Sequence, residues 1–302
     1  MRHRTTWRLR TRALEMGRRT LVMGVVNITP DSFSDGGFFI EQEAAVAHGL
    51  KLLDEGADLL DLGAESTRPG AQVSSRAGGP DAAVSADEEQ ARLMPVLEGI
   101  LRARPDAVVS VDTYKAATAG AALAAGAEIV NDVSGFAWDP ALAEVCARAG
   151  AGVVLSHTRG RPEQWRNQPQ LAPDALIAMV REGLAASLAA ARRAGIEDES
   201  IVIDPGYGFG KRLEENYALL ARQQELLALG RPLLAGLSRK SFLGHTLAPL
   251  FGGEPAPVDA REAASLAAMT AAILHGASIV RVHAVRPAAE AARIADAICA
   301  AH

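Results

Sequence analysis

The sequence predicts a single (β/α)8 barrel, and three observations support this fold class. First, a unit of apolar strand, polar strand end, loop and Ala/Leu-rich helix repeats eight times from residue 20 onward. Second, the strand candidates are apolar almost throughout, as expected for a parallel sheet covered by helices. Third, six helix-to-strand junctions carry a glycine at the position of a helix C-cap. Eight such units fit a closed barrel better than an open sheet.

The elements follow from these patterns in chain order. The strand candidates are residues 21–26, 58–62, 107–111, 128–130, 152–155, 201–203, 233–237 and 278–282. The helical patterns cover residues 41–55, 87–103, 115–125, 140–149, 174–194, 213–229, 261–275 and 287–300. The junction glycines are Gly56, Gly126, Gly150, Gly195, Gly230 and Gly276. We therefore predict one barrel domain over residues 20–302.

The pattern of residues 1–19 predicts an N-terminal basic hairpin or arm that covers one end of the barrel. Five arginines precede the first acidic residue, Glu15, which superficially resembles a transit peptide. However, apolar and basic residues alternate from Trp7 to Arg10, as in an extended strand. A basic arm could also contact RNA, which is the less favoured alternative.

Composition excludes several classes of protein. The 302 residues are 49% hydrophobic and 22% charged, which is typical of a globular chain with a large core. The net charge of −5 argues against general nucleic-acid or membrane-surface binding. Cys146 and Cys299 lie far apart without metal-ligand spacing, so we expect reduced thiols in a cytoplasmic protein. No apolar run reaches the ~20 residues of a membrane span.

The most informative stretch is residues 201–211 (IVIDPGYGFGK). Three β-branched residues run into Asp204, and Pro205 and three glycines then force a turn that allows close backbone approach. A carboxylate at the end of an apolar strand is costly to bury without a partner. A helix cap or a structural salt bridge would usually explain one such aspartate, but the same layout recurs along the chain.

Every predicted strand ends in a charged or hydrogen-bonding group. In a barrel these ends meet at one mouth, where the active site lies. The residues concerned are Asn27, Asp61, Glu65, Asp112, Asn131, Asp132, His157, Asp204, residues 238–241, Arg281 and His283.

These residues divide into two kinds. Asp112, Asn131 and Asp204 could pair with a flat, nitrogen-rich heterocycle. The cationic donors are Arg68, Lys240, Arg281 and His283. In a net acidic protein this asymmetry indicates an anionic substrate, with phosphate or carboxylate on one side.

Seven motifs in order resemble those of the dihydropteroate synthase family, from about residue 20 to near the C-terminus. They are residues 23–37 (MGVVNITPDSFSDGG), 65–70 (ESTRPG), 110–115 (SVDTYK), 130–132 (VND), 204–211 (DPGYGFGK), 238–241 (SRKS) and 281–283 (RVH). The resemblance implies condensation of 6-hydroxymethyl-7,8-dihydropterin diphosphate with p-aminobenzoate in folate biosynthesis. It also implies a sulfonamide target and a homodimer.

The resemblance implies a role for each matching residue. Asp112, Asn131, Asp204 and Lys240 would bind the pterin. The diphosphate would be held by Asn27, Arg68, Arg281 and His283, with Asn27 also binding Mg²⁺. The p-aminobenzoate would lie among Thr67, Arg68, Pro69, Phe209 and Ser241. Catalytic roles would fall to Asp31, Asp35, Lys240 and Arg281, with Asp31 and Asp35 in a mobile lid.

The implied mechanism is an SN1-like displacement in which diphosphate leaves before the aniline nitrogen attacks. A dedicated strong base is hardly needed to deprotonate the aniline nitrogen, because its proton becomes acidic once the C–N bond forms. For three residues we favour structural roles: Asp61 and Asp132 as strand-end caps, and Lys115 as a solvated lysine at a helix start.

Two segments depart from the family pattern. After the fifth strand, Thr158 stands where an apolar residue usually follows the histidine. Residues 74–86 are small, polar and rich in Gly and Ala, and appear as an insertion before the helix expected at Asp87. We expect this loop to affect p-aminobenzoate rather than pterin binding.

Two other functions remain open. One is a methyltetrahydrofolate-binding module of a corrinoid methyl-transfer system, which has no diphosphate to bind. The other is a catalytically silent pterin-binding paralogue, which would have lost part of the set Asn27, Arg68, Lys240 and Arg281. All four residues are present.

Overall fold

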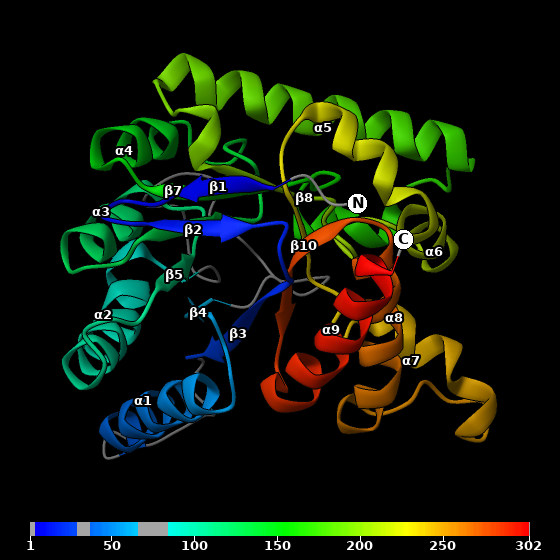
Figure 1. Cartoon of the computed structure of the whole chain (residues 1–302), viewed down its shortest axis with the longest axis horizontal. Coiled ribbons are helices and arrows are strands. Elements are labelled where there is room, and N and C mark those ends of the chain that lie inside the picture. Colours follow the sequence, from blue (N-terminus) through cyan, green and yellow to red (C-terminus); the bar gives the residue numbers. More distant parts are fainter. Residues whose placement is uncertain (1–3, 29–36, 66–83, 302) are drawn as a thin grey trace.

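The computed structural model describes residues 4–28, 37–65 and 84–301, and its eight central strands close into a parallel barrel (Figure 1). The barrel strands are β3 (Leu21–Asn27), β4 (Leu59–Gly63), β5 (Val109–Asp112), β6 (Ile129–Asp132), β7 (Gly152–Ser156), β8 (Ile201–Asp204), β9 (Leu233–Ala235) and β10 (Ala277–Val282). Each strand pairs with the next one along the chain, and β10 pairs with β3. The predicted (β/α)8 barrel is confirmed.

Helices surround the strands (Figure 1). They are α1 (Gly37–Asp54), α2 (Ala86–Ala103), α3 (Ala116–Ala124), α4 (Ala141–Ala149), α5 (Pro173–Ala194), α6 (Leu213–Arg222), α7 (Ser241–Thr246), α8 (Glu262–Leu274) and α9 (Val285–Ala300). The continuous helix predicted over 213–229 is wrong, because the chain tightens into a 3-10 helix, η3 (Gln223–Leu229). The change begins at Gln223, whose buried amide donates to the carbonyl oxygens of Ala272 and His275.

The ends of the helices follow the predicted turn chemistry. All six junction glycines have positive φ, between 64° at Gly150 and 117° at Gly126, where a Cβ is disfavoured. Helix α2 begins slightly earlier than expected, because Ser85 and Glu88 form a capping box. The six-residue α7 was not predicted, since it is too short to show a helical period.

The N-terminal chain forms the predicted hairpin, in which β1 (Thr5–Arg8) and β2 (Ala13–Met16) are antiparallel. It lies across the barrel end opposite the carboxyl ends of the strands (Figure 1). Trp7 and Met16 are almost wholly buried against Leu21, Met23 and other inward-facing strand residues. The indole N–H of Trp7 also donates to the carbonyl oxygen of Ser200 at 3.0 Å. The hairpin therefore closes one end of the barrel.

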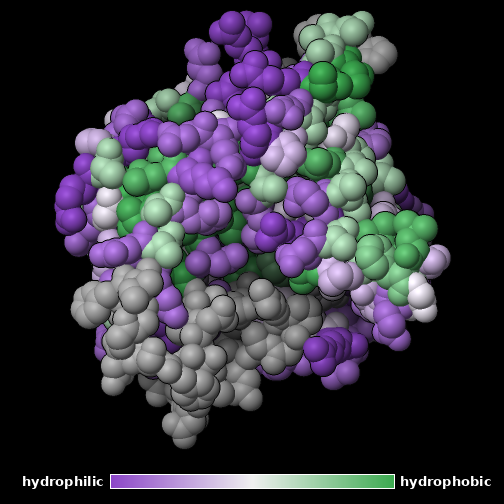
Figure 2. Space-filling view, turned by 90° about the horizontal axis from the view of Figure 1, so that it is seen from below, coloured by the Kyte–Doolittle hydropathy of each residue, from purple (hydrophilic) through white to green (hydrophobic). Residues whose placement is uncertain are grey.

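The surface is mixed in character. In Figure 2, hydrophobic residues form separate patches among hydrophilic ones on the face shown. Large exposed apolar side chains in the described part of the chain include Leu250, Leu274, Ile294 and Ile298. None of the helices within the described ranges has the length and hydrophobicity needed to cross a lipid bilayer.

Candidate active site

The period-two alternation of the strands brings the site residues together. On four strands, the inward-facing residue nearest the hairpin is apolar: Leu59 on β4, Ile129 on β6, Val202 on β8 and Ile279 on β10. The next inward-facing residue, two positions further along, is polar on each strand. These residues are Asp61, Asn131, Asp204 and Arg281. A polar layer thus lies directly above an apolar one, at the carboxyl ends of the strands.

Arg281 is held by two carboxylates at the centre of this layer. Its Nε donates to Asp61 Oδ2 at 2.6 Å, and its Nη2 donates to Asp112 Oδ2 at 2.8 Å. The amide of Asn131 donates to the same Asp61 oxygen at 2.9 Å. Asp61 has no exposed surface, and its Oδ1 has no hydrogen-bond partner among the described atoms. The expectation that Asp61 is a strand-end cap is wrong, because Asp61 lies inside β4 and orients Arg281.

Burial alters the ionisation of the carboxyls around Arg281. Burial raises the pKa of Asp112 to about 7, even though the charge of Arg281 acts to lower it. Burial also raises the pKa of Asp204. Both groups therefore hold a negative charge less readily than exposed aspartates do, and cationic ligand groups would favour that charge.

Asp204 is fixed by the turn that follows it. Its Oδ1 accepts a hydrogen bond from the backbone N–H of Gly206 at 2.7 Å. Gly206, Gly208 and Gly210 have φ values of 70°, 78° and 72°. A Cβ on Gly206 would overlap with the carbonyl oxygen of His157, so only glycine fits there. The other carboxylate oxygen of Asp204, Oδ2, lies close to Gly236, just after β9.

Lys240 and Phe209 form one side of the mouth. The Lys240 ammonium lies 3.8 Å from the centroid of the Phe209 ring, a cation–π contact. Burial lowers the pKa of Lys240 to about 8, although Asp204 acts to raise it. Nearby, Nδ1 of His283 lies 2.9 Å from the hydroxyl oxygen of Ser238. Ser241, at the start of α7, is exposed.

Lys115 is buried, so its prediction as a solvated lysine is wrong. Its ammonium pairs with Glu65 and, at 3.1 Å, with Glu89 Oε2, which also accepts from the Thr118 hydroxyl at 2.7 Å. Glu65 ends the described part of the β4 loop, so this cluster anchors the base of that loop. Burial raises the pKa of Glu65.

Asp132, by contrast, is confirmed as a strand-end cap. Its carboxylate accepts backbone N–H bonds from Ser134 at 2.8 Å and Phe136 at 2.5 Å. Phe136 has a φ of 70°, and these bonds stabilise that unusual conformation. Burial still raises the pKa of Asp132 to about 6.

The other predicted site residues lie at the rim or outside the described ranges. Asn27 is exposed at the end of β3. The hydroxyl of Thr158 donates to the carbonyl oxygen of Gly160 at 2.9 Å. Outside the described residues lie Asp31, Asp35, Thr67, Arg68, Pro69 and most of the loop 74–86.

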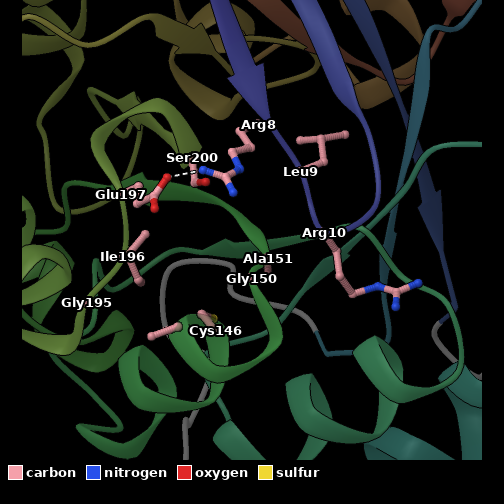
Figure 3. Close-up of a pocket in the computed structure, with 11 residues that line it drawn as sticks. Arg8, Leu9, Arg10, Cys146, Gly150, Ala151, Gly195, Ile196, Glu197 and Ser200 are labelled. Carbon is pink, nitrogen blue, oxygen red and sulfur yellow. Dashed lines mark hydrogen bonds and ion pairs between the residues drawn. The ribbon is translucent and has the colours of Figure 1, made fainter.

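A cavity of about 160 Å³ lies at the opposite end of the barrel (Figure 3). It is bounded by the hairpin and by the C-terminal ends of α4 and α5. The guanidinium of Arg8 is paired with Glu197 at its edge, whereas Arg10 points away from that pair. None of the predicted site residues lines this cavity, so it is separate from the mouth.

Two residues of the mouth were given no site role from the sequence. Asp61 was predicted to lie at the mouth but was interpreted as a strand-end cap, although the inward alternation indicates its direction, since it stands two residues after the apolar Leu59. Lys211 is 7% exposed and donates to three backbone carbonyl oxygens. Lys211 ends the motif at residues 204–211, but its role was not predictable, because the directions of carbonyl groups in a turn cannot be read from a sequence.

Fold and site together define an enzyme of the (β/α)8 class, with a charged, partly buried site at the strand ends. A family model described as "Pterin binding enzyme" matches residues 23–283. Dihydropteroate synthase of Mycobacterium leprae is 43% identical over 279 residues, which are 91% of this chain and 92% of that protein. The Synechocystis enzyme of the same name is 40% identical, over 94% and 92% of the two chains.

Solved structures agree with these relatives. Yersinia pestis dihydropteroate synthase in a sulfonamide drug complex is 37% identical, with a TM-score of 0.85 over 99% of this chain and 100% of that one. The Xanthomonas albilineans enzyme with 4-aminobenzoic acid is 42% identical, with a TM-score of 0.83 over 98% and 99%. The chain therefore belongs to the pterin-binding enzymes and, within them, to the dihydropteroate synthases.

Proposed function

We propose that this chain condenses 6-hydroxymethyl-7,8-dihydropterin diphosphate with p-aminobenzoate, giving 7,8-dihydropteroate and diphosphate in folate biosynthesis. The observation that carries the proposal is the polar layer of the mouth. There the charges of Asp204 and Lys240 interact, and Arg281 is held between two carboxylates. Complexes of relatives with 4-aminobenzoic acid and with 7,8-dihydropteroate support the same second substrate and the same product.

Asp204 would bind the 2-amino group and the ring N–H of the pterin. Such a two-point contact suits a carboxylate, and the charge-assisted hydrogen bonds would offset the cost of its burial. Asp112 and Asn131 would complete this edge, and the Lys240 ammonium would donate to the pterin carbonyl oxygen. The proposal is consistent with the position of all four residues around one opening, where Asn131 and Asp204 are buried and Asp112 and Lys240 are half-buried.

Arg281 and His283 would bind the departing diphosphate, together with Arg68. A guanidinium has five N–H donors, and the contacts to Asp61 and Asp112 use two of them. Among the contacts with described residues, three donors therefore remain for phosphate oxygens. Because the carboxylates fix the guanidinium before substrate arrives, little reorganisation is needed as negative charge develops on the leaving group.

The p-aminobenzoate would lie against Phe209 and Ser241, with Thr67, Arg68 and Pro69 from the β4 loop. In the proposed SN1-like reaction, the C–O bond to diphosphate breaks first, and the cation formed is delocalised into the dihydropterin ring. The neutral aniline nitrogen then forms the new C–N bond and loses its proton. The protein contributes chiefly by orienting the amine and stabilising the leaving charge. Asp31 and Asp35 remain proposed catalytic residues of the β3 loop.

The residues present fit a Mg²⁺ ion carried by the substrate. Within the described ranges no cluster of three His, Cys, Asp or Glu side chains could form a metal site. Mg²⁺, however, commonly takes one or two protein oxygens and completes its coordination with phosphate and water. Asn27 offers an exposed amide oxygen at the mouth. When bound, the ion would neutralise charge on the diphosphate.

We also propose a cytoplasmic homodimer built on residues 20–302 as its pterin-binding domain, with residues 1–19 as the closing hairpin. Exposed apolar side chains on α8 and α9, namely Leu274, Ile294 and Ile298, support an interface between copies. The buried Cys146 thiol, whose pKa is raised by burial, is consistent with a reducing compartment.

A steady-state assay of diphosphate release tests the proposed reaction. Release should depend on p-aminobenzoate and should yield dihydropteroate in equal amount. A methyltetrahydrofolate-binding module would release no diphosphate, either with or without p-aminobenzoate. A silent paralogue would bind the pterin diphosphate without turnover, so binding measured by calorimetry separates the two alternatives.

A further inference from the structure

Three backbone carbonyl groups converge on the ammonium of Lys211. Its Nζ donates to the oxygens of Gly206 at 2.8 Å, His157 at 3.1 Å and Phe209 at 3.3 Å. An ammonium has three N–H donors, so these bonds account for all of them. The side chain is 7% exposed. Lys211 is therefore held inside the turn rather than at the solvent.

These carbonyls belong to two elements that both border the mouth. His157 follows β7, whereas Gly206 and Phe209 lie in the turn between β8 and α6. The peptide groups of Gly206 link the ammonium to the site, because its carbonyl accepts from Lys211 while its N–H donates to Asp204 Oδ1. The turn's left-handed glycines allow these carbonyls to point inward together.

We infer that Lys211 is a positioning residue, which binds the carbonyls of His157, Gly206 and Phe209 and so directs the Asp204 carboxylate and the Phe209 ring toward the substrate. This inference rests on the proposed pterin site at Asp204. Lys211 does not touch the substrate itself. Its effect passes through the Gly206 backbone to Asp204 and through the Phe209 backbone to the ring that Lys240 covers.

The chemistry of the site favours lysine over arginine. A compact ammonium can donate in three directions, whereas a guanidinium donates within one plane. Without a donor at this point, three carbonyl dipoles would face one another inside the protein, and the turn would rearrange to separate them. Burial lowers the pKa of Lys211 to about 7, while the charge of Asp204 acts to raise it, so the two groups support each other's ionised forms.

Lys211→Met tests the inference, with Lys51→Met as the matched control. Lys51 is exposed in the last turn of α1, where it pairs with Glu55, and it has no role in the proposed site. Calorimetry with 6-hydroxymethylpterin, which lacks phosphate, reports on the pterin contacts, including that of Asp204, without the diphosphate contacts. We expect at least tenfold weaker pterin binding in Lys211→Met and unchanged binding in Lys51→Met. Lys211→Arg should not restore affinity, because charge without the three-way geometry is insufficient.

A double-mutant cycle with Asp204→Asn distinguishes positioning from general stability. If Lys211 acts through Asp204, Lys211→Met should weaken binding less than threefold in the Asp204→Asn background. Equal losses in both backgrounds, or unchanged pterin affinity with only a lowered Tm, would overturn the inference. If Lys211→Met does not fold, Lys211→Gln, which keeps two donors, replaces it in the same cycle. Failure of the unaltered protein to bind any pterin would contradict the proposed function instead.

Discussion

Asp61 illustrates at the scale of the residue how the mouth is organised before substrate arrives. A carboxylate without exposed surface is costly unless charged donors meet it, and Arg281 and Asn131 both donate to one of its oxygens. This contact joins β4, β6 and β10 across the barrel interior. Motif matching gave Asp61 no site role, because its partner stands 220 residues away in sequence. Only the closure of the barrel brings the two together.

Asp204→Asn should reduce turnover by orders of magnitude in a protein that remains folded. The amide would present an N–H toward the pterin's own N–H groups, replacing attraction with repulsion. Steady-state kinetics and circular dichroism measure the two expectations. Near-normal kcat/KM in a folded variant would contradict the assignment of Asp204 as the pterin anchor.

Pterin affinity should depend on pH with a maximum near neutrality. The pKa of Lys211 is lowered to about 7 and that of Lys240 to about 8, so both ammonium groups lose protons as pH rises through 7–9. Asp204 must be ionised, and its raised pKa weakens binding on the acid side. Calorimetry from pH 5.5 to 9.5 measures this profile. Constant affinity between pH 7 and 9 would show that neither ammonium supports the bound pterin.

The N-terminal hairpin shows at the scale of the element how a short segment completes a fold. Trp7 fills the end of the barrel, and the arginines of the hairpin reach the junctions between helices and strands. Arg10 donates to the carbonyl oxygen of Ala127 at 2.9 Å, and Arg12 to that of Asp106 at 2.7 Å. These carbonyls follow α3 and α2, whose C-terminal ends favour cations. The basic character of the segment is thus explained by contacts within the chain.

Trp7→Ala should lower the free energy of unfolding by about 3–5 kcal/mol, as expected for a fully buried tryptophan. Arg8→Ala is the matched control. Its ion pair with Glu197 is more than half exposed on both sides, so its removal should cost at most about 1 kcal/mol. Denaturant titration measures both. Equal small effects would mean that the hairpin is only loosely attached to the barrel.

Much of the element pattern was predictable, because strand apolarity and glycine caps are local signals. The change from α-helix to 3-10 helix after Arg222 was not, since the buried side chain of Gln223 contacts α8 about 50 residues later in sequence. Lys115 was misjudged for a similar reason. Its position before a helix resembles a solvated lysine, and only tertiary structure brings Glu65 and Glu89 to it. The strand-end residues of the mouth were predictable as a group, but their pairing was not.

The whole molecule is a closed barrel with two unlike ends. One end is plugged by apolar side chains from the hairpin, and the other opens onto charged groups. Closure leaves the barrel sheet without edge strands, so association through strand pairing is disfavoured there. Association between copies is instead expected through the outer helices, where exposed isoleucines lie on α9.

If the proposed dimer forms through α9, replacing both Ile294 and Ile298 by Glu should convert it to a monomer. Ile294 exposes 65% and Ile298 44% of its surface, so neither side chain is needed for the core. Four buried charges facing each other across a two-fold interface would be strongly unfavourable. Sedimentation velocity measures the state of both proteins. A monomeric unaltered protein, or a dimeric double variant, would contradict an interface at this face.

The placement of the three tryptophans gives the molecule two separate optical reporters. Trp7 lies at the plugged end without exposed surface, whereas Trp138 and Trp165 lie beside the mouth, in ring contact with Tyr114 and Phe209 respectively. Energy transfer to a bound pterin would quench the emission of Trp138 and Trp165 more than that of Trp7, because energy transfer falls steeply with distance. In a Trp138→Phe, Trp165→Phe background, the remaining emission would follow release of the hairpin. Fluorescence can therefore follow substrate binding and detachment of the N-terminal hairpin from the barrel as independent events.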